Sequence, residues 1–140
     1  MNLRCYYFLM MAMILISRTS FSLSGNIPVC PDKIAVKEQL LKLPTGWESL
    51  TSDIPHFLNG ISVYSGHPRD LVALKPDAIN EKKAMWSFST KDTIYVVCEY
   101  NGTSIILTQK IPAKIRHCEL IYNPFVRGEK GYIPKLLNCR

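Results

Sequence analysis

The 140-residue sequence lacks a run of apolar residues long enough to cross a membrane as a helix. Its most apolar stretch is "FLMMAMILI", residues 8–16, and nine residues are too few because a helix that crosses a bilayer needs about 20. The sequence also lacks closely spaced cysteines, and its three histidines stand apart. Zinc sites are built from such close pairs, so the spacing argues against a bound metal.

Motifs of the common enzyme classes are absent as well. The chain contains no G-x-S-x-G elbow, no phosphate loop and no H-E-x-x-H pair. His67 and Asp70 share one loop, "SGHPRD", but no candidate nucleophile accompanies them, and we interpret this segment as a turn. We therefore predict a protein that is not an enzyme and that has no cofactor.

The amino terminus has the pattern of a secretory signal peptide. Arg4 precedes the apolar stretch, and small residues follow it at Ser20, Ser22 and Ser24. Cleavage after Ser22 or Ser24 fits the pattern about equally well. The sequence thus predicts a leader, residues 1–24, and one domain, residues 25–140, in an exported protein that is either periplasmic or secreted.

Four cysteines remain after Cys5 is removed with the leader: Cys30, Cys98, Cys118 and Cys139. An even number in a short exported chain indicates two structural disulfides, and four cysteines allow three pairings. We favour Cys98 with Cys118, and Cys30 with Cys139, because the second bond would join the two ends of the domain. Oxidised cysteines cannot act as catalytic thiolates.

Alternating apolar residues predict a mainly β fold. In "YVVCEYNGTSII" a two-residue Asn101-Gly102 turn would place Cys98 opposite Ile105 on the core face of a hairpin. The preceding run, "AMWSFST", alternates too, and a three-residue turn would place Trp86 opposite Val96. With "GISVY" and "KIRHCELIY" as further strands, we predict a single small antiparallel sandwich or half-open barrel of five to seven strands, with two disulfides.

Basic residues gather in the carboxyl-terminal third. Residues 110–140 carry seven lysines and arginines against two glutamates, a balance of +5. Such a surface could meet an acidic partner or an anionic surface, although an ordinary solvated face is the simpler interpretation. No basic helix or aromatic stacking pattern indicates nucleic acid. The candidate partner-binding residues are Lys114, Arg116, His117, Arg127 and Lys130.

A series of short motifs carries a resemblance to a known family. The motifs follow one another as "CPDKIAV", "PTGW", "VYSGHP", "LKPD", "MWSFS", "VVCEY", "IILTQKIP", "RHCEL" and "NCR". In this order the chain resembles small exported proteins of Gram-negative bacteria, some of them found beside type VI secretion clusters. The resemblance implies a periplasmic location and the neutralisation of a toxin, and it transfers no catalytic or binding residue to this sequence.

Two functions from different classes follow. The first is an exported binding protein, a periplasmic immunity or inhibitor protein that neutralises a partner toxin or hydrolase. The alternative is an envelope-associated structural protein whose basic carboxyl-terminal face binds anionic lipid or polysaccharide. The first requires a protein partner, whereas the second requires only a membrane or polysaccharide surface; the oligomeric state stays open in both.

Overall fold

The computed structural model describes residues 30–51 and 53–140. The predicted leader, residues 1–24, lies outside the described residues. Within them the chain forms eight strands and one short 3-10 helix: β1 (Lys33–Ile34), β2 (His56–Ser65), η1 (Pro68–Asp70), β3 (Ala78–Ile79), β4 (Lys83–Ser87), β5 (Ile94–Tyr100), β6 (Ile106–Lys110), β7 (His117–Gly128) and β8 (Gly131–Cys139).

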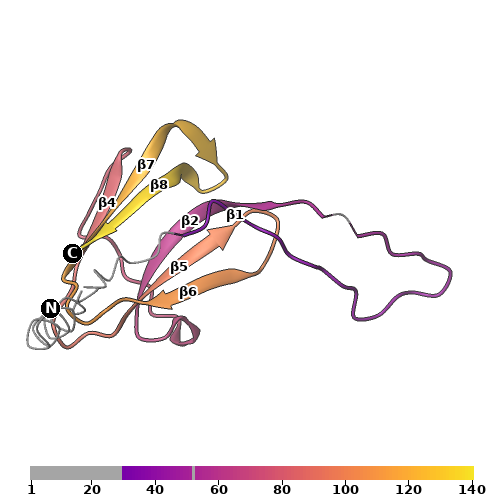
Figure 1. Ribbon diagram of the computed structural model, residues 1–140, viewed down its shortest axis with the longest axis horizontal. Coiled ribbons are helices and arrows are strands. Elements are labelled where there is room, and N and C mark those ends of the chain that lie inside the picture. The colour runs from indigo at the N-terminus through magenta and orange to yellow at the C-terminus, as the bar shows by residue number, and fades with distance from the viewer. Residues whose placement is uncertain (1–29, 52) are drawn as a thin grey trace, which may run out of the picture.

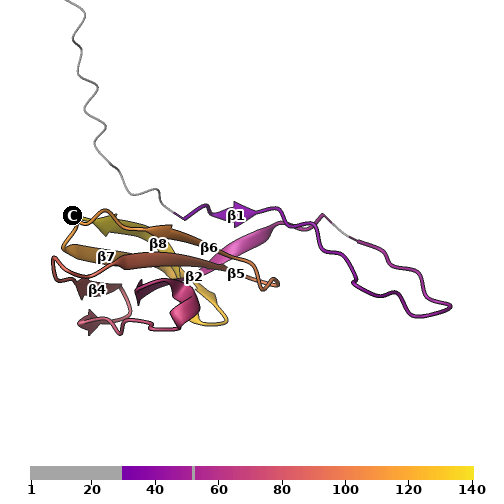
Figure 2. The ribbon, with the colours of Figure 1, turned by 90° about the horizontal axis from the view of Figure 1, so that it is seen from below.

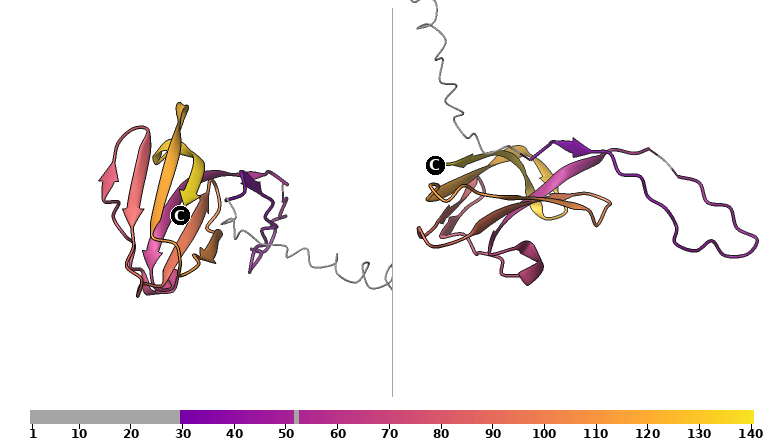
Figure 3. Two further views of the ribbon diagram at one scale, coloured as in Figure 1. Left: turned by 60° about the vertical axis from the view of Figure 1, so that its left-hand side comes forward. Right: turned by 60° about the horizontal axis from the view of Figure 1, so that its bottom comes forward.

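The strands form two antiparallel sheets of four strands each. The first sheet has the order β1-β2-β5-β6 and the second has the order β3-β4-β7-β8. Figures 1 and 3 show the two sheets as separate layers, with a long excursion of chain between β1 and β2. The predicted mainly β class is confirmed. The strand count exceeds the predicted range because β1 and β3 are only two residues long.

The core lies between the two sheets, where alternate residues of facing strands point inward. Trp86 of β4, Val96 of β5 and Leu120 of β7 are buried there. The indole nitrogen of Trp86 donates a hydrogen bond to the Leu74 carbonyl oxygen at 3.1 Å, so its polar atom keeps a partner inside the core. The remaining buried residues of this cluster include Leu58, Val63, Ala84, Phe88, Ile94, Tyr100, Ile111, Ile115 and Leu137.

The predicted disulfide pairing is wrong. The structure joins Cys30 to Cys98, and Cys118 to Cys139. Cys118 and Cys139 lie directly opposite each other on β7 and β8, whereas Cys98 lies on β5 in the other sheet. The prediction failed because it placed the strands of Cys98 and Cys118 side by side.

Two predicted strand pairings are also wrong. Trp86 lies opposite Cys118, not Val96, because β4 pairs with β7 and the chain crosses to the other sheet between β4 and β5. In the β5–β6 hairpin, Cys98 lies opposite Leu107, two residues beyond the predicted Ile105. The shift keeps Cys98 on its predicted, buried face, since a shift of two residues does not change the face.

The longer hairpin loop has a clear cause. The backbone N–H of Asn101 donates to the carbonyl oxygen of Phe57 at 2.9 Å, so β5 continues its pairing with β2 instead of turning back at once. Gly102 has the expected positive φ of 70°, but Asn101 does not share it. The predicted turn at 65–70 is confirmed: η1 begins after His67, whose side chain accepts a hydrogen bond from the Arg69 backbone.

Candidate functional site

The candidate partner-binding residues lie in two groups at opposite ends of β7. Lys114 and Arg116 precede this strand and His117 begins it, whereas Arg127 and Lys130 lie at or beyond its other end. Because β7 has 12 residues, and a strand rises about 3.3 Å per residue, the groups are separated by roughly 35 Å. The structure therefore does not bring all five residues together.

The first group forms a positively charged end of the second sheet. The Arg116 guanidinium donates to the carbonyl oxygens of Ala113 and Ile115, which holds this side chain over its own loop. The carboxyl-terminal Arg140 exchanges two backbone hydrogen bonds with His117, at 2.8 and 2.9 Å. This pairing places the charge of Arg140 beside His117, while Lys114 remains exposed.

Glu119 lies two residues into β7 from this end and forms an ion pair with Lys83 of β4. Its carboxylate accepts a hydrogen bond from Lys83 at 2.9 Å, and this bond is the main reason that the pKa of Glu119 lies below its ordinary value. Partial burial opposes the shift, and the charges of Lys83, His117 and Arg140 add to it.

The second group takes part in contacts within the protein. Arg127 donates a hydrogen bond to the Tyr132 hydroxyl at 2.6 Å and lies over the Tyr132 ring at 4.3 Å, which fixes it against the neighbouring strand. Its pKa is raised, chiefly by the bond to Tyr132. Lys130, in the turn between β7 and β8, forms an ion pair with Glu99 of β5. This ion pair joins the two sheets.

A small polar hollow surrounds the Glu99 carboxylate. It has a volume of about 210 Å³ and includes Asn59 and Ser62 of β2 with Tyr122 and Tyr132 of the second sheet. The Ser62 hydroxyl donates to Glu99 at 2.8 Å. Burial by itself would raise the pKa of Glu99, but the hydrogen bonds from Lys130 and Ser62, together with the Lys130 charge, lower it below the ordinary value.

The Glu99 ion pair predicts a dependence of stability on acid. A carboxyl group whose pKa is lowered by folding stabilises the protein above its unfolded-state pKa, and the contribution is lost as the pH falls through the folded-state pKa. We expect Glu99→Gln to reduce the free energy of unfolding by about 0.5–1 kcal/mol at pH 7, a small effect because Lys130 is largely exposed. Urea unfolding should show that the difference in free energy of unfolding between the variant and the unaltered protein shrinks as the pH falls below 4.5, the ordinary pKa of the group.

Glu48→Gln is the matched control for this substitution, because Glu48 is exposed and lies outside both sheets. It should leave the free energy of unfolding unchanged at pH 7 and also at a pH below 4.5. A difference between Glu99→Gln and the unaltered protein that persists at low pH would contradict the assignment to this ion pair.

The most unusual surface lies between β1 and β2. We call residues 35–55 the arm; its described residues form no helix or strand, and they extend away from both sheets (Figures 1 and 2). Loops of this length without secondary structure are uncommon in compact domains. Six large apolar side chains of the arm are exposed: Leu40, Leu41, Leu43, Trp47, Leu50 and Ile54.

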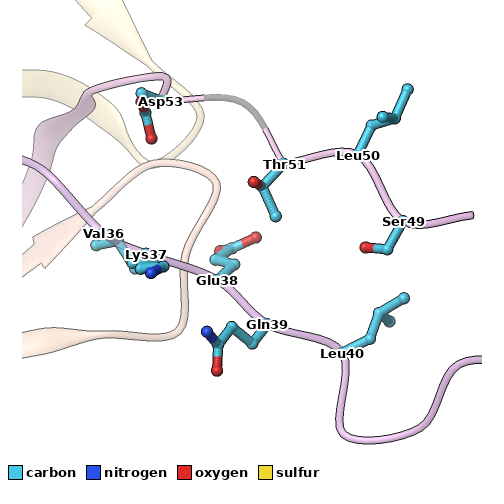
Figure 4. A pocket seen from close by; sticks show the side chains of 9 residues that line it. All are labelled: Val36, Lys37, Glu38, Gln39, Leu40, Ser49, Leu50, Thr51 and Asp53. Atoms are coloured by element: carbon cyan, nitrogen blue, oxygen red, sulfur yellow. The ribbon is translucent and has the colours of Figure 1, made fainter.

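The two limbs of the arm enclose a hollow of about 410 Å³. Figure 4 shows residues 36–40 along one limb and residues 49–51 along the other, with the side chains of Glu38 and Thr51 turned toward each other. A second hollow of about 390 Å³ lies at the base, where Val36 and Ile54 meet His56, Asn101 and Gly102. The two hollows give the arm and its base a contact surface of mixed polar and apolar side chains.

Sequence reasoning did not identify the arm as a site. The segment "DKIAVKEQLLKL" is ambiguous between strand and helix, and the turn at "PTGW" is visible, but the exposure of the leucines is not. One feature of the sequence could have indicated the arm. Apolar residues are frequent on both sides of the predicted turn, and they do not alternate strictly with polar residues.

Residues 30–51 and 53–140 contain neither a cluster of metal ligands nor a helix that could span a membrane. In this part of the chain no three His, Cys, Asp or Glu side chains are grouped so as to hold a metal ion. Nor does this part contain a helix with the length and apolar character needed to cross a membrane.

Comparison with known proteins gives one family and one relative. The family model of the type VI secretion system Tli immunity protein matches residues 51–140, which include β2 to β8 and the end of the arm. An uncharacterized 16.3 kDa protein from the trpG 5′ region of Azospirillum brasilense is 24% identical over 132 residues, covering 86% of this chain and 87% of the relative. No solved structure matches the chain.

The family match covers well over half of the chain and includes every strand except β1. It agrees with the resemblance to small proteins found beside type VI secretion clusters. The chain belongs to the type VI secretion system Tli immunity protein family.

Proposed function

We propose that this protein is an immunity protein that binds a toxin of a type VI secretion system and neutralises it without catalysis of its own. The observation that carries the proposal is the match of the immunity family model to residues 51–140. The fold is suited to the role, because two packed sheets and two disulfides form a rigid body. A rigid surface loses little conformational entropy when it binds a partner.

The proposed compartment is the periplasm. Residues 1–24 have the pattern of a signal peptide, and the remaining residues, 25–140, would form the mature domain. Two disulfides also suit an oxidising compartment. In this proposal the immunity protein meets a toxin that acts on the cell envelope or in the periplasm.

Co-expression with the toxin encoded beside the gene tests the function. Cells that direct this toxin to the periplasm should stop growing, and the full-length protein should restore growth. The purified mature protein should bind the purified toxin in calorimetry. A full-length protein that neither binds nor protects would contradict the proposed function.

The same assay tests the compartment separately. A chain without residues 1–24 should remain in the cytoplasm and fail to protect against the periplasmic toxin. If this chain protects as well as the full-length protein, export is not required and the periplasmic location is wrong, while the immunity function stands.

The positive end of β7 supports one alternative function. Lys114, Arg116, His117 and Arg140 lie together there, and an envelope-associated protein could bind anionic lipid or polysaccharide through them. Such binding should weaken steeply as salt is raised, because exposed charges are screened. Tight binding to the toxin that changes little with salt would contradict this alternative.

A further inference from the structure

The arm is held firmly at its base. Ile34 of β1 lies opposite His56 of β2, so the two limbs begin from adjacent, hydrogen-bonded strands. Cys30, just before β1, is joined to Cys98 of β5, and the Leu58 backbone N–H donates to the Asp32 carbonyl oxygen at 2.8 Å. A disulfide and a strand pair therefore fix the position from which the arm extends.

The side chains of the arm are unfavourable in water. Leu50 is 88% exposed and Trp47 is 73% exposed, while Leu41 is as exposed as in an extended peptide, at 105%. Soluble proteins rarely expose so many large apolar side chains together unless another molecule covers them. The turn at the tip, where the Trp47 backbone N–H donates to the Pro44 carbonyl oxygen at 3.2 Å, presents Trp47 at the far end of the arm.

The charges of the arm indicate which molecule covers it. The arm has two lysines against three acidic residues, a balance of −1, whereas residues 110–140 carry +5. Loops that insert into bacterial membranes are usually basic, because anionic lipids attract them. A nearly neutral, apolar, projecting segment with a tryptophan suits a protein groove, where aromatic anchors contribute most of the binding energy.

The bounds of the family match also favour the arm as the part of the chain that binds a protein partner. The matched residues, 51–140, contain every strand of the two sheets except β1, and they do not contain the tip of the arm. The sheets would then be the scaffold common to the family, and the tip would carry the contacts that select one toxin from others.

We propose that the arm is the toxin-binding element of this protein, and that it inserts into an apolar groove of the toxin with Leu41, Trp47 and Leu50 as anchors. This inference rests on the proposed immunity function and assigns its contact surface. The insertion blocks the groove, and the sheets act as the support that positions the arm.

The test compares two variants of the mature protein with the unaltered protein. The arm variant carries Leu41→Ser, Trp47→Ser and Leu50→Ser. The control, Ile79→Ser, changes an equally apolar residue that is 62% exposed on β3, at the outer edge of the second sheet. All substituted side chains are exposed, so thermal unfolding should occur at nearly the same temperature in the three proteins.

Calorimetry with the adjacent toxin and the growth assay give the readouts. We expect the arm variant to bind the toxin at least roughly 100-fold more weakly and to lose protection, because it lacks the three apolar side chains that would be buried in the toxin groove. The control should bind and protect like the unaltered protein. An arm variant that binds normally while the unaltered protein protects would overturn the inference and leave the immunity function intact.

Other occupants of the arm give different results. A dimer of the unaltered protein that becomes a monomer in the arm variant, with toxin binding unchanged, would assign the arm to a second copy of this chain. Arm-dependent sedimentation with vesicles of phosphatidylcholine or phosphatidylglycerol, again with toxin binding unchanged, would assign it to lipid. Either result overturns the inference, and failure of the unaltered protein to bind the toxin contradicts the proposed function and the inference together.

Discussion

Replacement of both Cys30 and Cys98 by alanine should lower the free energy of unfolding by about 4 kcal/mol. The bond joins residues that are 68 positions apart, so its loss frees a long loop in the unfolded chain. It also releases the segment before β1 from β5. Urea unfolding should give this loss directly, and the midpoint of thermal unfolding should fall on the order of 15 °C.

The second disulfide is the internal comparison. Cys118 and Cys139 are 21 positions apart, so the Cys118→Ala, Cys139→Ala protein should lose less, about 3 kcal/mol. The two double variants should therefore rank in the order of their loop lengths. A larger loss for the shorter loop would contradict the chain-entropy argument, and a Cys98–Cys118 peptide in a non-reduced digest would contradict the pairing itself.

The Cys30–Cys98 bond also bears on the arm. The bond fixes the start of β1, and β1 fixes one limb of the arm against β2. Because a flexible arm must be ordered when it binds, loss of the bond should weaken toxin binding even at temperatures where the protein remains folded. This expectation links the stability of the sandwich to its proposed function.

Local pattern in the sequence predicted the strands better than their partners. The segment "KIRHCELIY" was predicted as a strand, and its Cys118 and Leu120 are buried in the core on β7. Alternation does not show which strands pair with each other, because the inward-facing residues of both sheets of a sandwich are apolar. The chain changes sheets between β4 and β5, and the predicted pairing of Trp86 with Val96 failed at that step.

The disulfides failed for the same reason. Cys98 faces the core, as predicted, and Cys118 is buried there too, but the two residues belong to different sheets. The pairing of Cys118 with Cys139 depends on the register of β7 and β8, which places the two residues directly opposite each other. Register is set by the hairpin turn and by a shift of pairing along β7, and neither was apparent from residue spacing.

For the candidate partner-binding residues too, the sequence shows the residue types but not their positions in the fold. Composition shows that basic residues are frequent in the carboxyl-terminal third, but only the length of β7 shows that Lys114 and Lys130 lie at opposite ends of one strand. Lys130 is also engaged by Glu99, a residue distant in the sequence. The arm was missed because apolar residues in a sequence are ordinarily assigned to the core, and exposure depends on whether the fold leaves anything to cover them.

Gly128→Ala should destabilise the protein by about 2 kcal/mol, because a side chain at this position has no room. A Cβ atom on Gly128 would lie 2.5 Å from the Asn59 side-chain oxygen and 3.5 Å from a side-chain carbon of Ile133. Asn59 lies on β2 in the first sheet and is only 7% exposed, so it cannot move into solvent to make space. The two sheets would have to separate locally, next to the ion pair of Glu99 and Lys130.

A double-mutant cycle isolates this contact. Asn59→Ala removes the atoms that the new methyl group would meet, so Gly128→Ala should cost much less in that background, with a coupling of roughly 1–2 kcal/mol measured by urea unfolding. An equal cost in both backgrounds would show that the close approach of Asn59 is not the cause. Because Gly128 ends β7 just before the turn that carries Lys130, a coupling of the expected size would also show that this hairpin is seated against β2, as the inter-sheet ion pair requires.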